Sequence, residues 1–263
     1  MTADDPAALR AVAHEVADAA RAAVLPLFRR PLAVRSKGAA FDPVTEADRG
    51  AERAMRAVLA RRRPGDAVMG EEEADRSGTS GLTWVLDPID GTRAFISGAP
   101  TWGVLVGLRD ARGVRLGLVD QPFTAERFFG DAAGAEWTRG AERRALRVRG
   151  TDALAEATLL STFPEVGTPE EGAAFRRVAA RCRLTRYGLD CYGYALLAAG
   201  HVDLVIEAGL HPYDIVGPAG LIEAAGGIVT GWDGGSALGG GRVVAAATPA
   251  LHRAAMALLA GEG

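Results

Sequence analysis

Apolar and polar positions divide the chain into stretches with different periods. Within the first hundred residues, two helical runs are followed by two short β-like runs. A meander of β-rich runs then extends from Trp102 to Arg149. Beyond residue 150, helical and β-like runs alternate. The helices are expected over 6–27, 45–64, 170–182, 191–199, 214–225 and 249–260, and the strands outside the meander over 67–70, 83–86, 157–162, 184–188, 202–207, 227–232 and 243–247.

These patterns predict an α/β protein with two parts. An antiparallel-rich N-terminal part over 1–145 is expected to pack against a mixed C-terminal part over 146–263. Because no repeat and no low-complexity linker separates the two parts, we expect them to form one catalytic unit.

Composition narrows the class of protein. Of the 263 residues, 48% are hydrophobic, which is enough for a sizeable core and excludes wholesale disorder. Thirty basic and 33 acidic residues give a net charge of −3, which argues against a nucleic-acid partner. No apolar run approaches the roughly 20 residues that span a bilayer, and the N-terminus is acidic where a signal peptide is basic. We therefore expect a cytoplasmic protein with no membrane partner.

The basic residues are arginines with one exception, Lys37. Either an ammonium group is needed at this position, or a lysine has survived by chance in a surface loop. The two cysteines, Cys182 and Cys191, are too few for a disulfide framework or a zinc site.

Acidic residues gather directly after predicted strands and at the start of a predicted helix. Glu71, Asp87, Asp90 and Asp214 all take such positions. Ligands bind at strand ends in α/β sheets, because the loops there converge while the strands hold them rigidly. Converging carboxylates repel one another unless a cation lies between them, and Mg²⁺ prefers oxygen ligands. The pattern predicts a site for divalent cations.

The run DPIDGT over 87–92 joins such acids to a helix start. The proline stiffens the turn, so both aspartates and the carbonyl of Ile89 can face neighbouring ions. The glycine lets the backbone approach closely, and the helix start offers backbone amides to a phosphate: those of Gly91, Thr92 and Arg93. Together these features predict a metal-dependent phosphate site.

Each acid taken alone has a plainer explanation. An Asp after a strand is often a helix cap or a turn residue, and Thr45-x-x-Asp48 matches a capping box. The glutamates 71–73 also fit a solvated charged edge. The prediction of a metal site therefore depends on the order in which the elements occur together.

That order resembles the inositol monophosphatase family of lithium-sensitive, Mg²⁺-dependent phosphatases. The resemblance spans about residues 8–258 and rests on Lys37, DPVTEAD (42–48), GEE (70–72), WVLDPIDGT (84–92) and YDIVGPAG (213–220) followed by EAAGG. The runs DPIDGTRAFISG (87–98) and GLDCYGYALLAAGHVDLVIEAGL (188–210), with the YDI form of the last motif, are most similar to histidinol-phosphatases. The resemblance implies a layered α/β/α/β/α sandwich that forms a homodimer.

The resemblance also implies roles for individual residues. A first ion would be held by Glu71, Asp87 and the carbonyl of Ile89, a second by Asp87, Asp90 and Asp214, and a loosely held third by Glu71. Thr92 and Asp48 would activate the attacking water, with Lys37 nearby. The implied reaction is hydrolysis of L-histidinol phosphate to L-histidinol and phosphate by direct attack of a metal-activated water. It would use two or three Mg²⁺ ions in each active site, and Mn²⁺ also fits.

Two further acids bear on the choice of substrate. Glu207 falls where the family places a substrate-contacting glutamate, and Asp190 lies where members acting on inositol usually have small residues. Two extra anions suit a cationic alcohol such as histidinol. The plainer alternatives are an N-cap on helix 191–199 for Asp190 and a surface acid at a strand end for Glu207. A departure from the family pattern, Pro218, is expected to tilt the helix that carries Asp214.

Two other functions remain open at this point. One is an inositol-1-phosphate or broad-specificity sugar and polyol phosphate phosphatase on the same scaffold. The other is a catalytically idle relative that binds RNA-processing partners. The set of acids speaks against the idle relative, because a binding module has no use for them.

Overall fold

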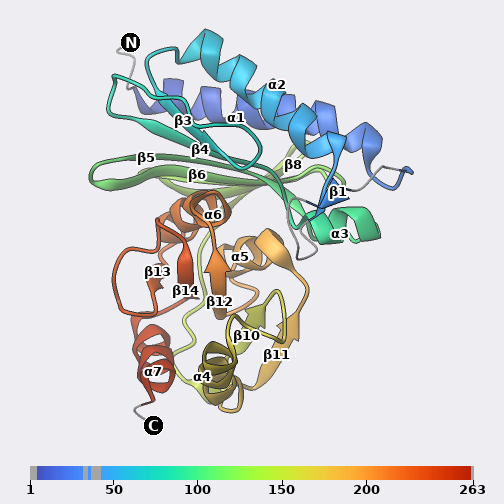
Figure 1. The fold of residues 1–263 in the computed structure, drawn as a ribbon. Coiled ribbons are helices and arrows are strands. Elements are labelled where there is room, and N and C mark those ends of the chain that lie inside the picture. The colour runs from blue at the N-terminus through green and yellow to red at the C-terminus, as the bar shows by residue number, and fades with distance from the viewer. Residues whose placement is uncertain (1–4, 32–34, 37–42, 262–263) are drawn as a thin grey trace.

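The computed structural model describes residues 5–31, 35–36 and 43–261. Its helices and sheets alternate in five layers (Figure 1). Helices α1 (Pro6–Val24) and α2 (Glu46–Arg62) cover the outer face of a seven-stranded sheet. Helices α5 (Asp190–Ala198) and α6 (Pro212–Ala224) lie between that sheet and a five-stranded one. Helices α4 (Pro169–Ala179) and α7 (Pro249–Ala260) cover the far face of the second sheet. This is the expected α/β/α/β/α sandwich.

The seven-stranded sheet is a meander with one parallel pair at its edge. Its strands follow one another in chain order: β3 (Ala67–Gly70), β4 (Thr83–Asp90), β5 (Gly103–Asp110), β6 (Gly113–Gln121), β7 (Glu126–Asp131), β8 (Gly134–Arg139) and β9 (Glu142–Leu146). Only β3 and β4 pair in parallel. The strand expected to end at residue 86 instead reaches Asp90, with a shift of register between Asp87 and Asp90. This irregularity lies within the DPID run, where proline cannot donate to the ladder.

The five-stranded sheet is mixed. Its spatial order is β11 (Leu184–Tyr187), β10 (Thr158–Ser161), β12 (Leu204–Leu210), β14 (Gly241–Ala246) and β13 (Ile228–Gly231). The first three strands are parallel, and the last two are joined to them by antiparallel pairing. The carboxyl ends of β10 and β12 therefore lie at one edge of the sheet, where a ligand site is expected.

The remaining elements are short. They are η1 (Leu25–Leu27), β1 (Arg35–Ser36), β2 (Pro43–Val44), α3 (Thr92–Ser97) and η2 (Leu154–Glu156). Asp5 caps α1, and Pro26 lies just beyond the end of this helix, in η1. Across the ranges given above, no helix combines the length and the apolar composition that crossing a bilayer requires.

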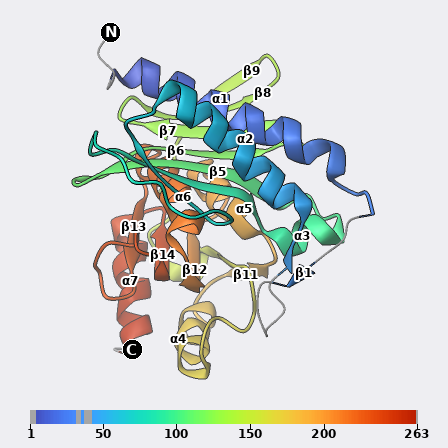
Figure 2. The ribbon, with the colours of Figure 1, turned by 45° about the horizontal axis from the view of Figure 1, so that its top comes forward.

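Three hydrophobic cores lie between the layers, because strand residues alternate between the two faces of each sheet. Within β5, Val104 and Val106 belong to the core under α1 and α2, whereas Leu105 belongs to the core around α5 and α6. Within β12, Val205 faces α5 and α6, and Ile206 belongs to the core under α4 and α7. One stack of layers thus holds both parts of the chain together (Figure 2).

Helix α6 approaches the seven-stranded sheet closely because glycines face each other across the contact. A Cβ at Gly117 of β6 would collide with the carbonyl oxygen of Gly217, and one at Gly220 would come within 2.6 Å of Val114. The helix continues without a break through Pro218, which is buried. Pro218 therefore does not interrupt the helix; the tilt expected from it stays a prediction. Helix α6, with Asp214 in its first turn, packs on the sheet that carries Asp87 and Asp90.

Candidate active site

Four acids predicted as metal ligands meet where the two sheets face each other. One carboxylate oxygen from each of Asp87, Asp90 and Asp214 lies within 4.8 Å of the others. Glu71 joins them because β3 and β4 are parallel and Gly70 pairs with Leu86, which places Glu71 beside Asp87 within hydrogen-bonding reach. Acids separated by up to 143 positions along the chain thus form one cluster.

The electrostatics of this cluster call for a cation. Asp87 is 1% exposed, and burial raises its pKa well above the usual value, followed by the charges of Glu71, Asp90 and Asp214. Burial also raises the pKa of Asp90, followed by the charges of Asp214 and Asp190, although the backbone N–H of Cys191 donates to Asp90 Oδ2 at 2.6 Å. An oxygen-only donor set whose charges repel one another fits hard divalent ions such as Mg²⁺.

Asp48 has a structural partner and a partner at the site. At the start of α2 its Oδ2 accepts hydrogen bonds from the backbone N–H of Thr45 at 2.8 Å and from Thr45 Oγ1 at 2.6 Å, which completes a capping box. Its Oδ1 lies 3.3 Å from Thr92 Oγ1, which donates to it or to the carbonyl of Ile89 at 3.1 Å. The capping role and the pairing with Thr92 therefore coexist.

The turn before α3 is shaped by Gly91. Its φ of 80° lies in the left-handed region, and a Cβ at this position would come within 2.8 Å of Asp190 Cγ. Only glycine therefore allows the end of β4 and the first turn of α3 to pack against the start of α5. The Ile89 carbonyl, predicted as a metal ligand, accepts from Thr92 and keeps a second lone pair.

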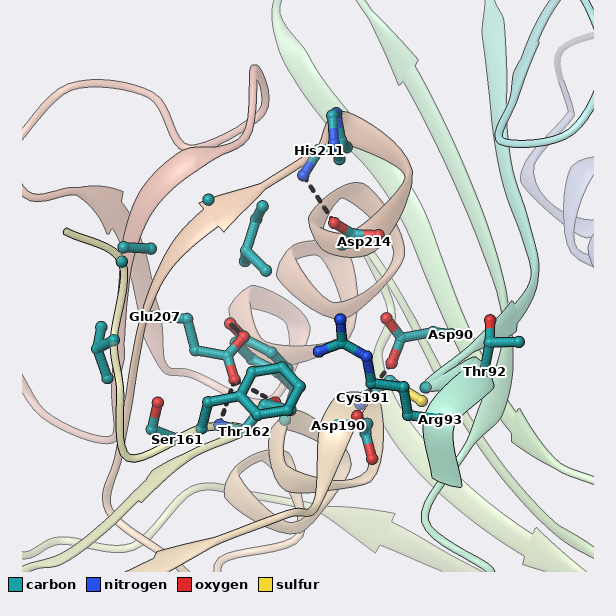
Figure 3. Close-up of a pocket in the computed structure, with 18 of the residues that line it drawn as sticks. Asp90, Thr92, Arg93, Ser161, Thr162, Asp190, Cys191, Glu207, His211 and Asp214 are labelled. Atoms are coloured by element: carbon teal, nitrogen blue, oxygen red, sulfur yellow. Dashed lines mark hydrogen bonds between the residues drawn. The ribbon is translucent and has the colours of Figure 1, made fainter. Parts of the chain in front are cut away.

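A cavity of about 350 Å³ extends from the acids toward the five-stranded sheet. Figure 3 shows Asp90, Asp214 and Thr92 on one side of it and Glu207 and Thr162 on the other, with the Arg93 side chain pointing between them. His211 also lines the cavity; its backbone N–H donates to Asp214 Oδ2 at 2.7 Å and its ring stacks on Tyr213.

Asp190 stands at the first position of α5 and lines the cavity. The helix is capped by Leu189, and the Asp190 carboxylate accepts from Thr101 Oγ1 at 3.2 Å, so the alternative that Asp190 is the N-cap is wrong. Its φ of 46° is left-handed, a conformation that Asp tolerates better than most residues. Burial raises its pKa to about 6, opposed by the hydrogen bond from Thr101 and the charge of Arg93.

Glu207 is 7% exposed, so the alternative of a surface acid is wrong. Its Oε1 accepts from the backbone N–H of Thr162 at 2.8 Å and from Thr162 Oγ1 at 2.5 Å, and its Oε2 accepts from the hydroxyl of Tyr194 at 3.1 Å. Burial raises its pKa, and the donors from Thr162 and Tyr194 oppose that effect. A carboxylate has about four acceptor positions, so one remains for a ligand.

Sequence reasoning located the acids but missed the hydroxyl groups that hold two of them. Thr101 and Thr162 belong to no motif, and Tyr194 lies within the run 188–210 without having been singled out there. Their partners lie 89, 45 and 13 positions away, so no local signal pairs them. Lys37, predicted to lie near the Thr92–Asp48 pair, and most of the loop 36–44 fall outside the described residues.

The model of the inositol monophosphatase family matches residues 5–262. The chain belongs to this family. Its members are phosphatases that generally use Mg²⁺, in agreement with the acid cluster.

Individual relatives differ in the substrate that their names state. The bifunctional phosphatase IMPL2, chloroplastic, of Arabidopsis thaliana is 39% identical over 226 residues, which cover 85% of this chain and 64% of that protein, slightly under two thirds of its length. A histidinol-phosphatase of Streptomyces coelicolor is 36% identical over 234 residues, covering 85% of this chain and 86% of that protein. The solved structure of an inositol monophosphatase from Zymomonas mobilis has a TM-score of 0.84 at 38% identity, covering 95% of this chain and 96% of that one.

Proposed function

We propose that this family member is a metal-dependent phosphomonoesterase that hydrolyses L-histidinol phosphate to L-histidinol and phosphate, as in histidine biosynthesis. The observation that carries the substrate is a pair of acids on the cavity wall beyond the metal cluster, the half-buried Asp190 and the buried Glu207. Family membership supports the assignment as a phosphatase, and this second pair of acids supports the choice of substrate.

Charge balance supports a cationic alcohol. Two divalent ions would neutralise Glu71, Asp87, Asp90 and Asp214. Among the described residues that line the cavity, Asp190, Glu207 and Glu165 are then opposed by one guanidinium, that of Arg93. A phosphate ester of a neutral polyol brings no positive charge to balance the remaining acids. Histidinol carries an ammonium group and an imidazole, so it can pair with these carboxylates, whereas a neutral polyol cannot.

The ions would be held by Glu71, Asp87, Asp90, Asp214 and the carbonyl of Ile89. When bound, divalent ions supply Lewis acidity, which acidifies a water and neutralises charge on the phosphoryl oxygens. The backbone amides of Gly91, Thr92 and Arg93 at the start of α3 would hold the equatorial phosphoryl oxygens.

The chain's own groups provide a path for the proton of the attacking water. Thr92 Oγ1 has one hydrogen, and when it donates to Asp48 Oδ1 its lone pairs face outward to accept from water. As the water attacks phosphorus and the bond from phosphorus to the ester oxygen breaks, the proton of the water passes to Thr92 Oγ1 while the Thr92 proton passes to Asp48. The departing alkoxide would take its proton from solvent and leave as the alcohol. The two donors from Thr45 hold the other oxygen of Asp48 and fix the carboxylate in this orientation.

The alternative function is hydrolysis of inositol 1-phosphate or of small sugar and polyol phosphates. The resemblance to the inositol monophosphatase of Zymomonas mobilis over nearly the whole chain favours it. The two proposals differ in the use of Asp190 and Glu207, which a polyol phosphatase does not require as charges.

Phosphate release from L-histidinol phosphate and from inositol 1-phosphate, each with Mg²⁺, with Mn²⁺ and with EDTA, tests the proposal. We expect a higher kcat/KM for L-histidinol phosphate and no turnover in EDTA. Asp190→Asn, which keeps the shape and the bond from Thr101, should lower kcat/KM for L-histidinol phosphate about tenfold and leave inositol 1-phosphate unaffected or improved. Asp131→Asn, at the end of β7 and outside the lining of the cavity, is the control.

Equal or better hydrolysis of inositol 1-phosphate by the wild type would favour the alternative. Hydrolysis that survives EDTA would overturn the metal assignment. We also propose a cytoplasmic homodimer, supported by family membership; light scattering of the purified protein tests the oligomeric state.

A further inference from the structure

Phe163 is a large apolar residue at the cavity that no core explains. It lies in the segment between β10 and α4, lines the cavity and is 45% exposed. Within the described part of the chain it belongs to none of the three hydrophobic cores and pairs with no other aromatic ring. Its ring is therefore available to whatever occupies the cavity.

The face of this ring already holds a planar cation. The guanidinium carbon of Arg93 lies 5.0 Å from the centroid of the Phe163 ring, within the range of a cation–π contact. The contact crosses the cavity, because Arg93 comes from α3 beside the seven-stranded sheet and Phe163 follows a strand of the five-stranded sheet. Figure 3 shows Arg93 directed into the space between Glu207 and Asp90.

The other residues that line the cavity indicate where each group of an amino-alcohol phosphate would bind. The phosphoryl group belongs at the metal cluster and the start of α3, and an ammonium group belongs with Asp190 and Glu207. A planar ring on the same alcohol can then turn toward the segment over 162–167, where Phe163 offers an exposed aromatic face. The other aromatic rings of the lining are engaged elsewhere, because His211 and Tyr213 stack on each other and Tyr194 is buried with its hydroxyl on Glu207. Guanidinium and imidazolium are both planar, delocalised cations, so a surface that stacks with one can stack with the other.

We propose that Phe163 is a specificity-determining residue that stacks with the imidazole ring of the substrate, on the ring face that the Arg93 guanidinium contacts in this structure. This inference rests on the proposed function, since it names the part of L-histidinol that the enzyme recognises. Phe163 would recognise the ring of the substrate, whereas Asp190 and Glu207 recognise only its charge.

The test compares L-histidinol phosphate with O-phosphoethanolamine, which carries the ammonium and phosphate groups but no ring. Phe163→Ala should lower the ratio of kcat/KM for L-histidinol phosphate to kcat/KM for O-phosphoethanolamine about three- to tenfold, mainly by raising KM for L-histidinol phosphate. Phe163→Tyr should keep the ratio. Phe163→Leu, which keeps an apolar cover but has no ring face, should lower the ratio as the alanine variant does.

Phe123→Ala is the matched control, because Phe123 is similarly exposed, at 44%, and also contacts an arginine but lies away from the cavity. Loss of the same factor from both substrates in Phe163→Ala, or a wild-type ratio in Phe163→Leu, would overturn the inference while leaving the proposed function intact. A wild-type enzyme that is inactive on L-histidinol phosphate with Mg²⁺ would overturn both.

Discussion

Asp48→Asn separates the structural role of Asp48 from its proposed role in proton transfer. The amide oxygen of Asn can still accept from the N–H and Oγ1 of Thr45, so the capping box of α2 is kept and the free energy of unfolding should change by less than about 1 kcal/mol. The amide NH₂ then faces Thr92 Oγ1, where the carboxylate oxygen lay 3.3 Å away. It donates a hydrogen bond to Thr92 Oγ1 and cannot take up the Thr92 proton, so kcat should fall about 10²- to 10⁴-fold.

The assay combines steady-state phosphate release with urea unfolding of the same preparations. Asp48→Ala should lose activity and in addition about 1–2 kcal/mol of stability, because it removes the capping box. The control is Glu171→Ala in the second capping box, at the start of α4, where Glu171 accepts from the N–H of Thr168 at 2.7 Å. It should lose stability and keep kcat. A kcat for Asp48→Asn within about threefold of the wild type would refute the proton path, given the general-base contribution above.

Three further outcomes are expected away from the proton path. Asp120→Asn should cost about 3–5 kcal/mol in urea unfolding, because Asp120 is fully buried and accepts from both Arg21 and Arg127, which would lose a charged partner. Burial, followed by the charge of Arg127, lowers the pKa of His14, so the stability that its neutral form contributes should be present above about pH 6.5 and lost as the pH falls below it. The difference between the free energies of unfolding in urea at pH 7.5 and at pH 5.5 should therefore be smaller for His14→Gln than for the wild type. Gly117→Ala should cost about 1–3 kcal/mol in urea unfolding by pushing α6 off the sheet, and a Mg²⁺ titration should show weaker binding.

The acid cluster could be predicted from the sequence because its members end or follow strands or lie in the first turn of a helix. Loops converge at strand ends in α/β sheets, so Asp87 and Asp90 needed only a place near the end of a strand. Glu71 required a second fact, the parallel pairing of β3 with β4, which no local pattern gives. The sandwich itself came from the resemblance, since strand counting alone does not assign strands to sheets.

The surroundings of Asp190 and Glu207 could not be predicted in the same way. Asp190 has the local pattern of a helix cap, but its carboxylate bonds to Thr101 on the other side of the site. The environment of Glu207 depends on Thr162, which the parallel pairing of β10 with β12 brings alongside. Both outcomes are set by tertiary packing, which overrides the local preference of a single residue.

The two halves of the proposed reaction fall in separate stretches of the chain. The groups proposed to act on phosphorus lie almost entirely within residues 48–93, whereas those proposed to face the leaving alcohol lie within 162–207. A library of variants confined to the second stretch would therefore search for new leaving groups without altering the proposed hydrolytic apparatus, and Asp214 stays unchanged because it lies beyond this stretch.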